Sequence, residues 1–337
     1  MNRSLFRLLT TIVLPVAGLV LAAFLIMLSA KGVDWGLLRE TFVGIDLIPA
    51  AAALLSLIAM YVVNARRWAF IIPTEHSLKL SDVFPAVMIG YLVNTITPLR
   101  LGDVARSTVV SRSHRIPVGR LMGSIFAEHL FDALMLVLVV AVFALFIPVP
   151  PAARTTIIVG AVAGSFAGIF VMALTADRFK QLEKFALPFG RVGAKLFAIA
   201  REFNLGFNSL RESHRVLGGV MLTLLVWVFV FAYAALLAHS LNLDLPWYAP
   251  IFAVALAGLG ASIPGTPAAI GIFQIAVVAG LSVWTDDATS VLAYAFAVHA
   301  LQLVLNLLIG GVMAIRMGYL SSHGFSARGR APDTTDQ

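Results

Sequence analysis

The chain has 337 residues, of which 60% are hydrophobic and only 12% are charged, and its mean hydropathy is +0.94. A soluble protein of this length carries about twice that charged fraction, so the composition indicates an all-α, polytopic integral membrane protein. The absence of cysteine excludes disulfides, thiolate nucleophiles, iron–sulfur clusters and cysteine-ligated zinc. The net charge of +7 indicates basic cytoplasmic loops rather than nucleic-acid binding.

Six segments are apolar and long enough to cross the roughly 30 Å hydrocarbon core of a bilayer. They cover residues 9–30, 45–63, 118–146, 155–176, 216–239 and 289–315. The first follows Arg3 and Arg7 in the charge order of a signal peptide, but its apolar stretch is too long for one, so we expect a span. Residues 318–337 are polar, which predicts a disordered cytoplasmic tail.

Two further apolar regions, residues 81–117 and 249–283, are interrupted by proline and glycine. These residues free backbone groups from helical hydrogen bonds, which lipid tolerates only where the groups line a cavity inside the protein or in water. A simple kink is the alternative. The predicted break residues are Pro98, Gly102, Pro264, Gly265, Pro267 and Gly271.

The basic residues predict how these two regions thread. Of 24 lysines and arginines, 21 lie in the N-terminus, in segments 64–80, 98–120 and 177–215, and in the tail. If all 21 face the cytoplasm, each interrupted region enters the membrane and returns as a re-entrant helical hairpin. The order is then span, span, hairpin, span, twice, with the second copy inverted. One domain, 1–317, would hold repeats at about 8–147 and 154–316, with both termini cytoplasmic. The alternative is eight ordinary spans.

The segment 118–146 carries three ionisable residues, Glu128, His129 and Asp132, near the predicted bilayer centre. Glu128 and Asp132 are four residues apart and share a helix face. A charge at this depth costs several kcal/mol unless it is paired or hydrated. The residues therefore line a polar or proton-coupled site, or form a structural ion pair, for instance with Arg106. We favour the site, because three ionisable residues exceed what one pair needs.

The polar limb after the first break carries Arg100, Asp103 and Arg106. Guanidinium groups bind two phosphate oxygens at once, which predicts a vestibule for phospholipid head groups with Arg106 at its cytoplasmic mouth. The alternative is a positive-inside anchor on anionic lipids. Arg66 and Arg67, at the end of the second span, are interpreted as interfacial anchors.

A polar stripe at helical spacing, His299, Gln302 and Asn306, lies on the last span. It would either complete the cavity or hold helices together by hydrogen bonds.

The run Gly90–Arg106, with Gly102-Asp103-Val104-Ala105-Arg106, resembles the flippase-like transmembrane family that includes the membrane half of lysylphosphatidylglycerol synthases. Two more of its motifs fall at Glu128-His129-Leu130-Phe131-Asp132 and at Ile263-Pro264-Gly265 with Gly271-Ile272-Phe273-Gln274. The resemblance covers about residues 5–317. The family usually has Glu, Arg and Glu where this chain has Asp103, His129 and Gln274. The aminoacyl-transferase domain of the synthases is not matched, so lipid synthesis is not implied.

Together these patterns predict a translocator, not an enzyme, that moves a phospholipid or polyprenyl-phosphate-linked lipid between leaflets of the cell (inner) membrane. No Walker A motif is present, so ATP is not expected to drive it. The alternatives are a secondary transporter for a small anion and a membrane-embedded transferase or phosphatase. We expect anionic lipid head groups as partners, no nucleic acid, no metal and no cofactor; a homo-oligomer and a separately encoded lipid-modifying enzyme are further candidates. The predicted substrate-binding or translocation residues are Arg100, Asp103, Arg106, Glu128, His129, Asp132, Gln274, His299 and Gln302.

Overall fold

The structure is a computed structural model that describes residues 36, 43–75, 77–97, 100–146, 190–207, 212–261 and 266–318. Within these ranges every regular element is a helix. The expected spans at 9–30 and 155–176, the tail beyond Gly318, and the break residues Pro98, Pro264 and Gly265 lie outside the described residues.

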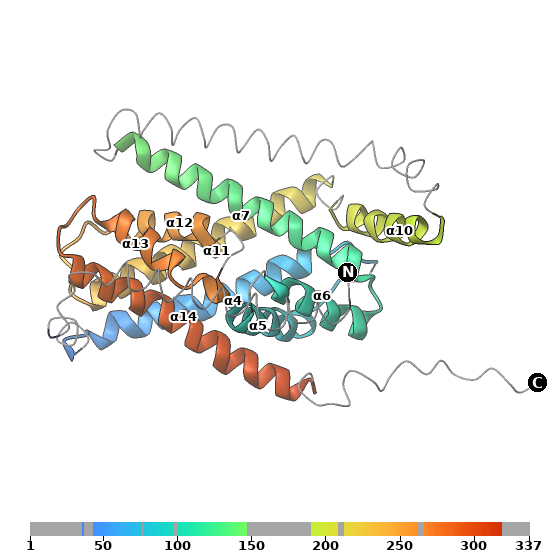
Figure 1. The fold of residues 1–337 in the computed structure, drawn as a ribbon, viewed down its shortest axis with the longest axis horizontal. Coiled ribbons are helices and arrows are strands. Elements are labelled where there is room, and N and C mark those ends of the chain that lie inside the picture. Colours follow the sequence, from blue (N-terminus) through green and yellow to red (C-terminus); the bar gives the residue numbers. More distant parts are fainter. Residues whose placement is uncertain are drawn as a thin grey trace, which may run out of the picture.

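Four long helices form the frame of the molecule and run lengthwise through it (Figure 1). They are α4 (Leu47–Ile71), α7 (Val118–Phe146), α11 (Ser213–Ser240) and α14 (Ala288–Arg316). Each is long and apolar enough to cross a membrane, which makes the chain a multi-pass membrane protein. The helices lie where four of the six spans were predicted. However, α4 continues about two turns past the predicted end at residue 63, and this extension carries Arg67.

A first pair of short helices, α5 (Leu80–Ile96) and α6 (Leu101–His114), packs antiparallel. Near the tip, a Cβ added to Gly102 would lie only 1.9 Å from the carbonyl oxygen of Gly90, so the backbones touch. At the open end, His114 lies 3.7 Å from Asp82. The first interrupted region is therefore a helical hairpin whose turn falls at the predicted break.

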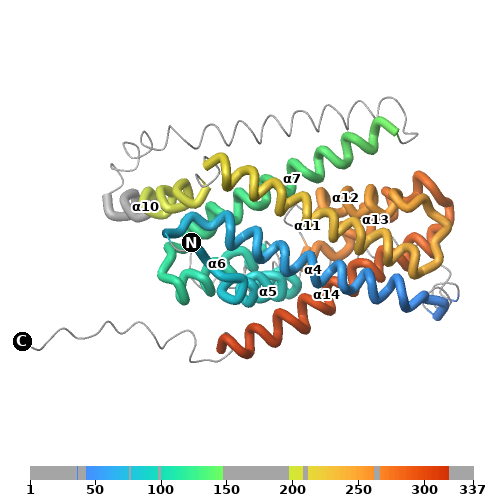
Figure 2. Tube along the Cα trace, turned by 180° about the vertical axis from the view of Figure 1, so that it is seen from behind, coloured from blue at the N-terminus to red at the C-terminus, as the bar shows by residue number. Residues whose placement is uncertain are grey.

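A second pair, α12 (Ala249–Ala261) and α13 (Ile272–Leu281), is built in the same way, with a short 3₁₀ turn, η4 (Pro267–Ala269), before α13. A Cβ on Gly280 would lie 2.8 Å from the Cα of Ala253, and one on Gly260 would lie 3.2 Å from Ile272. This hairpin occupies the opposite half of the molecule from α5–α6 (Figures 1 and 2). The two tips therefore meet near the middle of the frame.

Both hairpin tips hold non-glycine residues in the left-handed backbone region. Arg100 has φ 53°, and Ala268 and Ala269 have φ 52° and 57°. Such conformations cost on the order of 1 kcal/mol or more each and persist only where the surrounding contacts fix them. The turns are thus held in defined, strained shapes.

One more helix, α10 (Gly190–Phe207), lies along the first half of α7 (Figure 2). Glycines permit the close approach, because a Cβ on Gly123 would lie 2.0 Å from the carbonyl oxygen of Phe203. The guanidinium of Arg120 donates two hydrogen bonds to Glu202, at 2.7 and 3.0 Å. These contacts fix the part of α7 that precedes its ionisable residues.

Candidate functional site: a charged cavity between the hairpin tips

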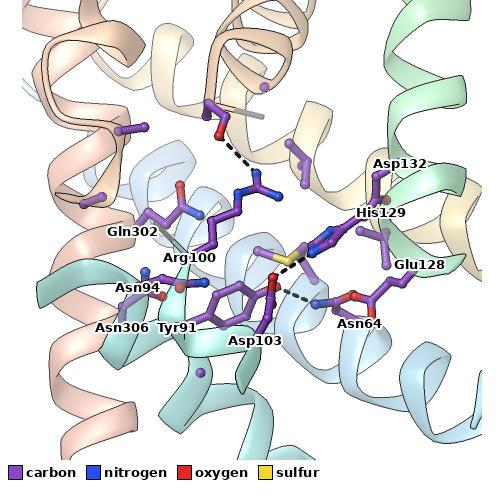
Figure 3. Close-up of a pocket in the computed structure, with 18 of the residues that line it drawn as sticks. Asn64, Tyr91, Asn94, Arg100, Asp103, Glu128, His129, Asp132, Gln302 and Asn306 are labelled. Atoms are coloured by element: carbon purple, nitrogen blue, oxygen red, sulfur yellow. Dashed lines mark hydrogen bonds and ion pairs between the residues drawn. The ribbon is translucent and has the colours of Figure 1, made fainter. Parts of the chain in front are cut away.

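A cavity of about 640 Å³ lies where the two hairpin tips meet the long helices (Figure 3). Its arginine, carboxylate, histidine and amide side chains come from α4, α5, α6, α7 and α14 and from Arg100 at the first tip. They are Asn64, Arg67, Asn94, Arg100, Asp103, Arg106, Glu128, His129, Asp132, His299, Gln302 and Asn306. The structure thus brings together all the predicted site residues except Gln274, which lies behind His299.

The break residues themselves lie beside the cavity. Among the described break residues, Gly102, Pro267 and Gly271 are not part of its lining. Their neighbours Thr266 and Ala268 are. Gly102 serves instead as the point of close contact between α5 and α6.

Arg67 is the centre of the charged wall and is only 1% exposed. Its guanidinium donates to both carboxylate oxygens of Asp132, at 2.6 and 2.9 Å, and to Glu128 at 2.9 Å. It also donates to the hydroxyl of Thr223 at 3.0 Å and to the amide oxygen of Asn64 at 2.8 Å. Arg67 therefore ties α4 to both α7 and α11.

The interpretation of Arg67 as an interfacial anchor is wrong. Its neighbour Arg66 is exposed, but Arg67 points into the bundle because α4 continues as a helix to Ile71. A signal for this was present in the sequence. Two carboxylates on one face of an intramembrane helix, Glu128 and Asp132, need cationic partners, and Arg67 is one of the arginines next to a predicted span.

Arg106 lies inside the protein, 5% exposed, and not at a cytoplasmic mouth as its spacing from the break had suggested. It forms ion pairs with Asp103 at 3.1 Å and with Glu128 at 3.2 Å. Its guanidinium carbon also lies 4.8 Å from the ring centroid of Trp68, a cation–π geometry. The ion pair between Arg106 and Glu128 was the structural alternative at the sequence level. Glu128 in fact bridges Arg106 and Arg67.

His129 completes the group that we call the charged cluster. Its Nε2 lies 2.9 Å from Asp103, and its side chain is 35% exposed toward the cavity. The charged cluster consists of Arg67, Asp103, Arg106, Glu128, His129 and Asp132. Its three carboxylates face two guanidiniums and one imidazole.

Arg100 differs from the other two arginines of the cavity. It lies between Gln302 and His129, and its guanidinium points at a backbone carbonyl (Figure 3). That acceptor is the oxygen of Ala261 at the end of α12, 3.0 Å away. Among the described residues, no carboxylate forms an ion pair with Arg100. It is a cation of the cavity whose charge is not matched by a contacting anion.

A second polar group, which we call the neutral cluster, contains no carboxylate and no guanidinium: Gly271 and Gln274 come from the second hairpin, and His299 comes from α14. The Gly271 amide donates to the side-chain oxygen of Gln274 at 2.7 Å, and the Gln274 nitrogen lies 3.0 Å from Nδ1 of His299. The His299 ring stacks on Phe273, with centroids 4.5 Å apart. Gln274 and His299 are both almost fully buried.

The polar stripe of α14 divides between its two predicted roles. Asn306 accepts from the hydroxyl of Tyr61 at 2.7 Å and donates to Thr95 at 3.3 Å, so it links three helices. Gln302 lines the cavity with its side chain. Interhelical bonding and cavity lining thus coexist on one helix face.

In the part of the chain that the structure describes, no group of three histidine or carboxylate side chains is arranged to hold a metal ion. The acids of the charged cluster are instead engaged by arginine or histidine.

No curated protein and no solved structure matches the chain. Residues 16–310 match the family described as the lysylphosphatidylglycerol synthase TM region. This match spans the four long helices almost completely and both hairpins, and it confirms the resemblance carried by the motifs around Gly102, Glu128 and Gln274. The chain belongs to the family of lysylphosphatidylglycerol synthase transmembrane regions, a membrane domain associated with lipids.

Proposed function

We propose that the protein moves a phospholipid, or a polyprenyl-phosphate-linked lipid, between membrane leaflets, without ATP and without chemistry on the lipid. The observation that carries this proposal is a cavity of about 640 Å³, lined by ionisable side chains, inside a bundle of apolar helices. Charged residues at membrane depth are costly and typically line substrate or ion pathways. Membership of a lipid-associated family supports a lipid cargo.

The charged cluster forms a polar wall of the cavity whose side chains hold one another in place. Its arginines and carboxylates are held by reciprocal contacts across α4, α6 and α7. A head group passing this wall exchanges water for fixed charges and amides, while its acyl chains stay in the lipid. Arg100, His129 and Gln302 are among the partly exposed side chains of the cavity, and in this proposal they meet the head group.

We propose further that the two hairpins are re-entrant and enter from opposite faces of the membrane, as an inverted repeat. Their helices have 10–17 residues, fewer than the roughly 20 that cross a bilayer. They occupy opposite halves of the molecule, and their tips meet (Figure 1). Broken helices that meet near the midplane are typical of transporters built from inverted repeats. In this arrangement both termini are cytoplasmic and the protein lies in the cell (inner) membrane.

Single cysteines test this topology, because the chain has none of its own. Lys79 and Arg112 are exposed near the open end of the first hairpin, and Asp286 is exposed beyond the second. We expect Lys79→Cys and Arg112→Cys to react with an impermeant maleimide only from the cytoplasm, and Asp286→Cys only from outside. Reaction of Lys79→Cys and Arg112→Cys from opposite faces would establish ordinary spans instead of a hairpin.

The function is tested by leaflet exchange of a fluorescent phospholipid in proteoliposomes. The decisive variant is Gln302→Leu, which keeps the side-chain volume but removes a polar group from the cavity. If Gln302 gives the head group one hydrogen bond of about 1 kcal/mol during passage, its loss should slow exchange about fivefold. The matched control is Arg115→Gln, an exposed residue at the far end of α6. Exchange no faster than in protein-free liposomes would refute lipid translocation.

The second candidate is a transporter for a small soluble anion, favoured by the cavity-facing charge of Arg100. It shares the architecture but predicts flux of an entrapped anion, such as phosphate, without any lipid exchange. Measuring both fluxes in the same proteoliposomes separates the two functions.

A further inference from the structure

We infer that Arg100 is a latch between the two hairpin tips, and that a phosphate group opens it by replacing the carbonyl of Ala261 as the partner of the guanidinium. The inference deepens the proposed function and rests on it in one respect: a phosphate-bearing head group must reach the cavity. In this inference, Arg100 couples the binding of the cargo to the movement of the hairpins.

The first step is the availability of Arg100. The guanidiniums of Arg67 and Arg106 are both engaged by carboxylates and are 1% and 5% exposed. Arg100 is only partly buried and makes one hydrogen bond, to a neutral oxygen. A guanidinium has five N–H donors, so this single bond leaves other donors of a cavity-lining residue available to a ligand. An entering anion meets this arginine without first breaking an ion pair.

The second step is what Arg100 holds. Ala261 is the last residue of α12, where carbonyl groups have no partner within the helix and carry the negative end of the helix dipole. Arg100 is the residue just before α6. Their bond therefore joins the end of one hairpin arm to the start of another, across 161 positions of sequence.

The third step is competition between two acceptors. A phosphate offers charged oxygens, and charge-assisted bonds to guanidinium are about twice as strong as neutral ones. A phosphate on Arg100 would also face the negative end of α12, and these two groups repel each other. Phosphate binding therefore favours separation of the tips.

The test measures the distance between the tips by pulsed electron paramagnetic resonance spectroscopy (double electron–electron resonance). Spin labels are placed at Leu101→Cys, which is exposed on α6, and at Leu259→Cys on α12, in the otherwise cysteine-free chain. The full-length protein is studied in maltoside detergent alone, with inorganic phosphate, with phosphatidylglycerol, and with diacylglycerol, which has no phosphate. We expect a longer-distance population to grow with phosphatidylglycerol and to be absent with diacylglycerol.

The phosphate and lipid arms identify the source of the ligand. A shift with inorganic phosphate alone would mean that the phosphate group suffices, whereas a shift only with phosphatidylglycerol would mean that the lipid must be attached; both support the latch. The same distance in all four samples would overturn it, and so would an equal shift with diacylglycerol.

Three variants attribute the response to the guanidinium. Arg100→Gln should abolish the shift, and Arg100→Lys, which keeps the charge but loses the planar fork, should raise the half-maximal lipid concentration about tenfold. Arg115→Gln should respond as the unsubstituted chain does. A full response of Arg100→Gln would overturn the latch, and if that variant fails to fold, the labelled parent chain still decides.

Leaflet exchange measured in parallel keeps the two proposals separate. Exchange without a distance shift would overturn the latch alone, and a distance shift without exchange would overturn lipid translocation alone.

Discussion

The α5–α6 hairpin brings Asp103 and Arg106 into a cluster of ion pairs, whereas the α12–α13 hairpin brings a neutral glutamine and the backbone carbonyl that Arg100 contacts. Both hairpins have short antiparallel arms, a strained turn and a tip near the middle of the molecule. The same backbone design thus supports two different kinds of site. Charge is concentrated on one side of the cavity, and the other side offers acceptors and stacked rings.

This difference sets how each side tolerates change. A buried ion pair that loses one partner leaves a buried charge, which is more costly than a lost hydrogen bond between neutral groups. The charged cluster should therefore be rigid and intolerant, and the neutral cluster more permissive. Four predictions test this contrast, from the largest expected effect to the smallest.

Arg67→Ala should destabilise the protein most, by about 3–5 kcal/mol, because Asp132 and Glu128 both lose a buried partner. The loss is measured as the change in unfolding free energy of the purified protein in detergent. Arg66→Ala is the control on the same helix, and as an exposed residue it should stay within about 0.5 kcal/mol of the parent. Equal losses for the two variants would show that Arg67 is not a central partner.

Gly102→Ala should cost about 1–3 kcal/mol, since the new Cβ would overlap the Gly90 carbonyl at 1.9 Å and the Asn94 amide at 2.6 Å. In the second hairpin, Gly260→Ala meets only the end of Ile272 at 3.2 Å and should be nearly neutral. Gly311→Ala on α14 meets nothing within 4 Å and should stabilise by about 0.5–1 kcal/mol. Thermal unfolding of the three proteins gives the order, and a larger loss at Gly260 than at Gly102 would contradict the closer backbone approach at Gly102.

Gln274→Leu should cost about 1 kcal/mol, because it removes the hydrogen bonds to Gly271 and His299 without leaving a charge unpaired. The measurement is again the unfolding free energy, with Arg67→Ala as the reference. A loss as large as that of Arg67→Ala would mean that the two sides of the cavity do not differ in tolerance.

Replacing Asp103 and His129 together should have the smallest effect on the unfolding free energy. These two positions depart from the usual residues of the family, and the structure places them in contact at 2.9 Å. The double variant Asp103→Glu with His129→Arg should preserve an ion pair, so the two substitutions should couple favourably by about 0.5–1 kcal/mol. A double-mutant cycle in unfolding free energy measures this coupling, and strict additivity would contradict it.

The long helices followed from the sequence because a span of about 20 apolar residues has few alternatives to a helix. The segment 118–146 was predicted with the bounds that α7 has, and both interrupted regions form helix pairs whose described arms end at the breaks. The end of the second span was set too early. The polar residues Asn64 and Arg67 were taken as its edge, but in the structure they belong to the buried face of α4.

The predicted residues of the cavity were found because buried charge in an apolar chain is rare and therefore informative. Which of these residues form ion pairs with one another was harder to predict from the sequence. Spacing along one helix gives the shared face of Glu128 and Asp132, but Arg67 reaches them from another helix 61 and 65 positions away. The bond from Arg100 to Ala261 could not be foreseen, since a backbone carbonyl has no signature in sequence.

The backbone amide of Gly102 is occupied by the side chain of Asn94, at 2.7 Å, and that of Gly271 by the side chain of Gln274, also at 2.7 Å. Free amides at helix starts are strong traps for anions. Gly102 and Gly271 lie beside the cavity, and because both amides are already bonded, neither helix start offers a passing head group an additional binding point there. A permeation route needs contacts favourable enough to admit its cargo and weak enough to let it go. The side chains of Asn94 and Gln274 therefore shorten the time for which cargo stays bound and so favour its release. Replacing either of them by an apolar residue should lengthen that time.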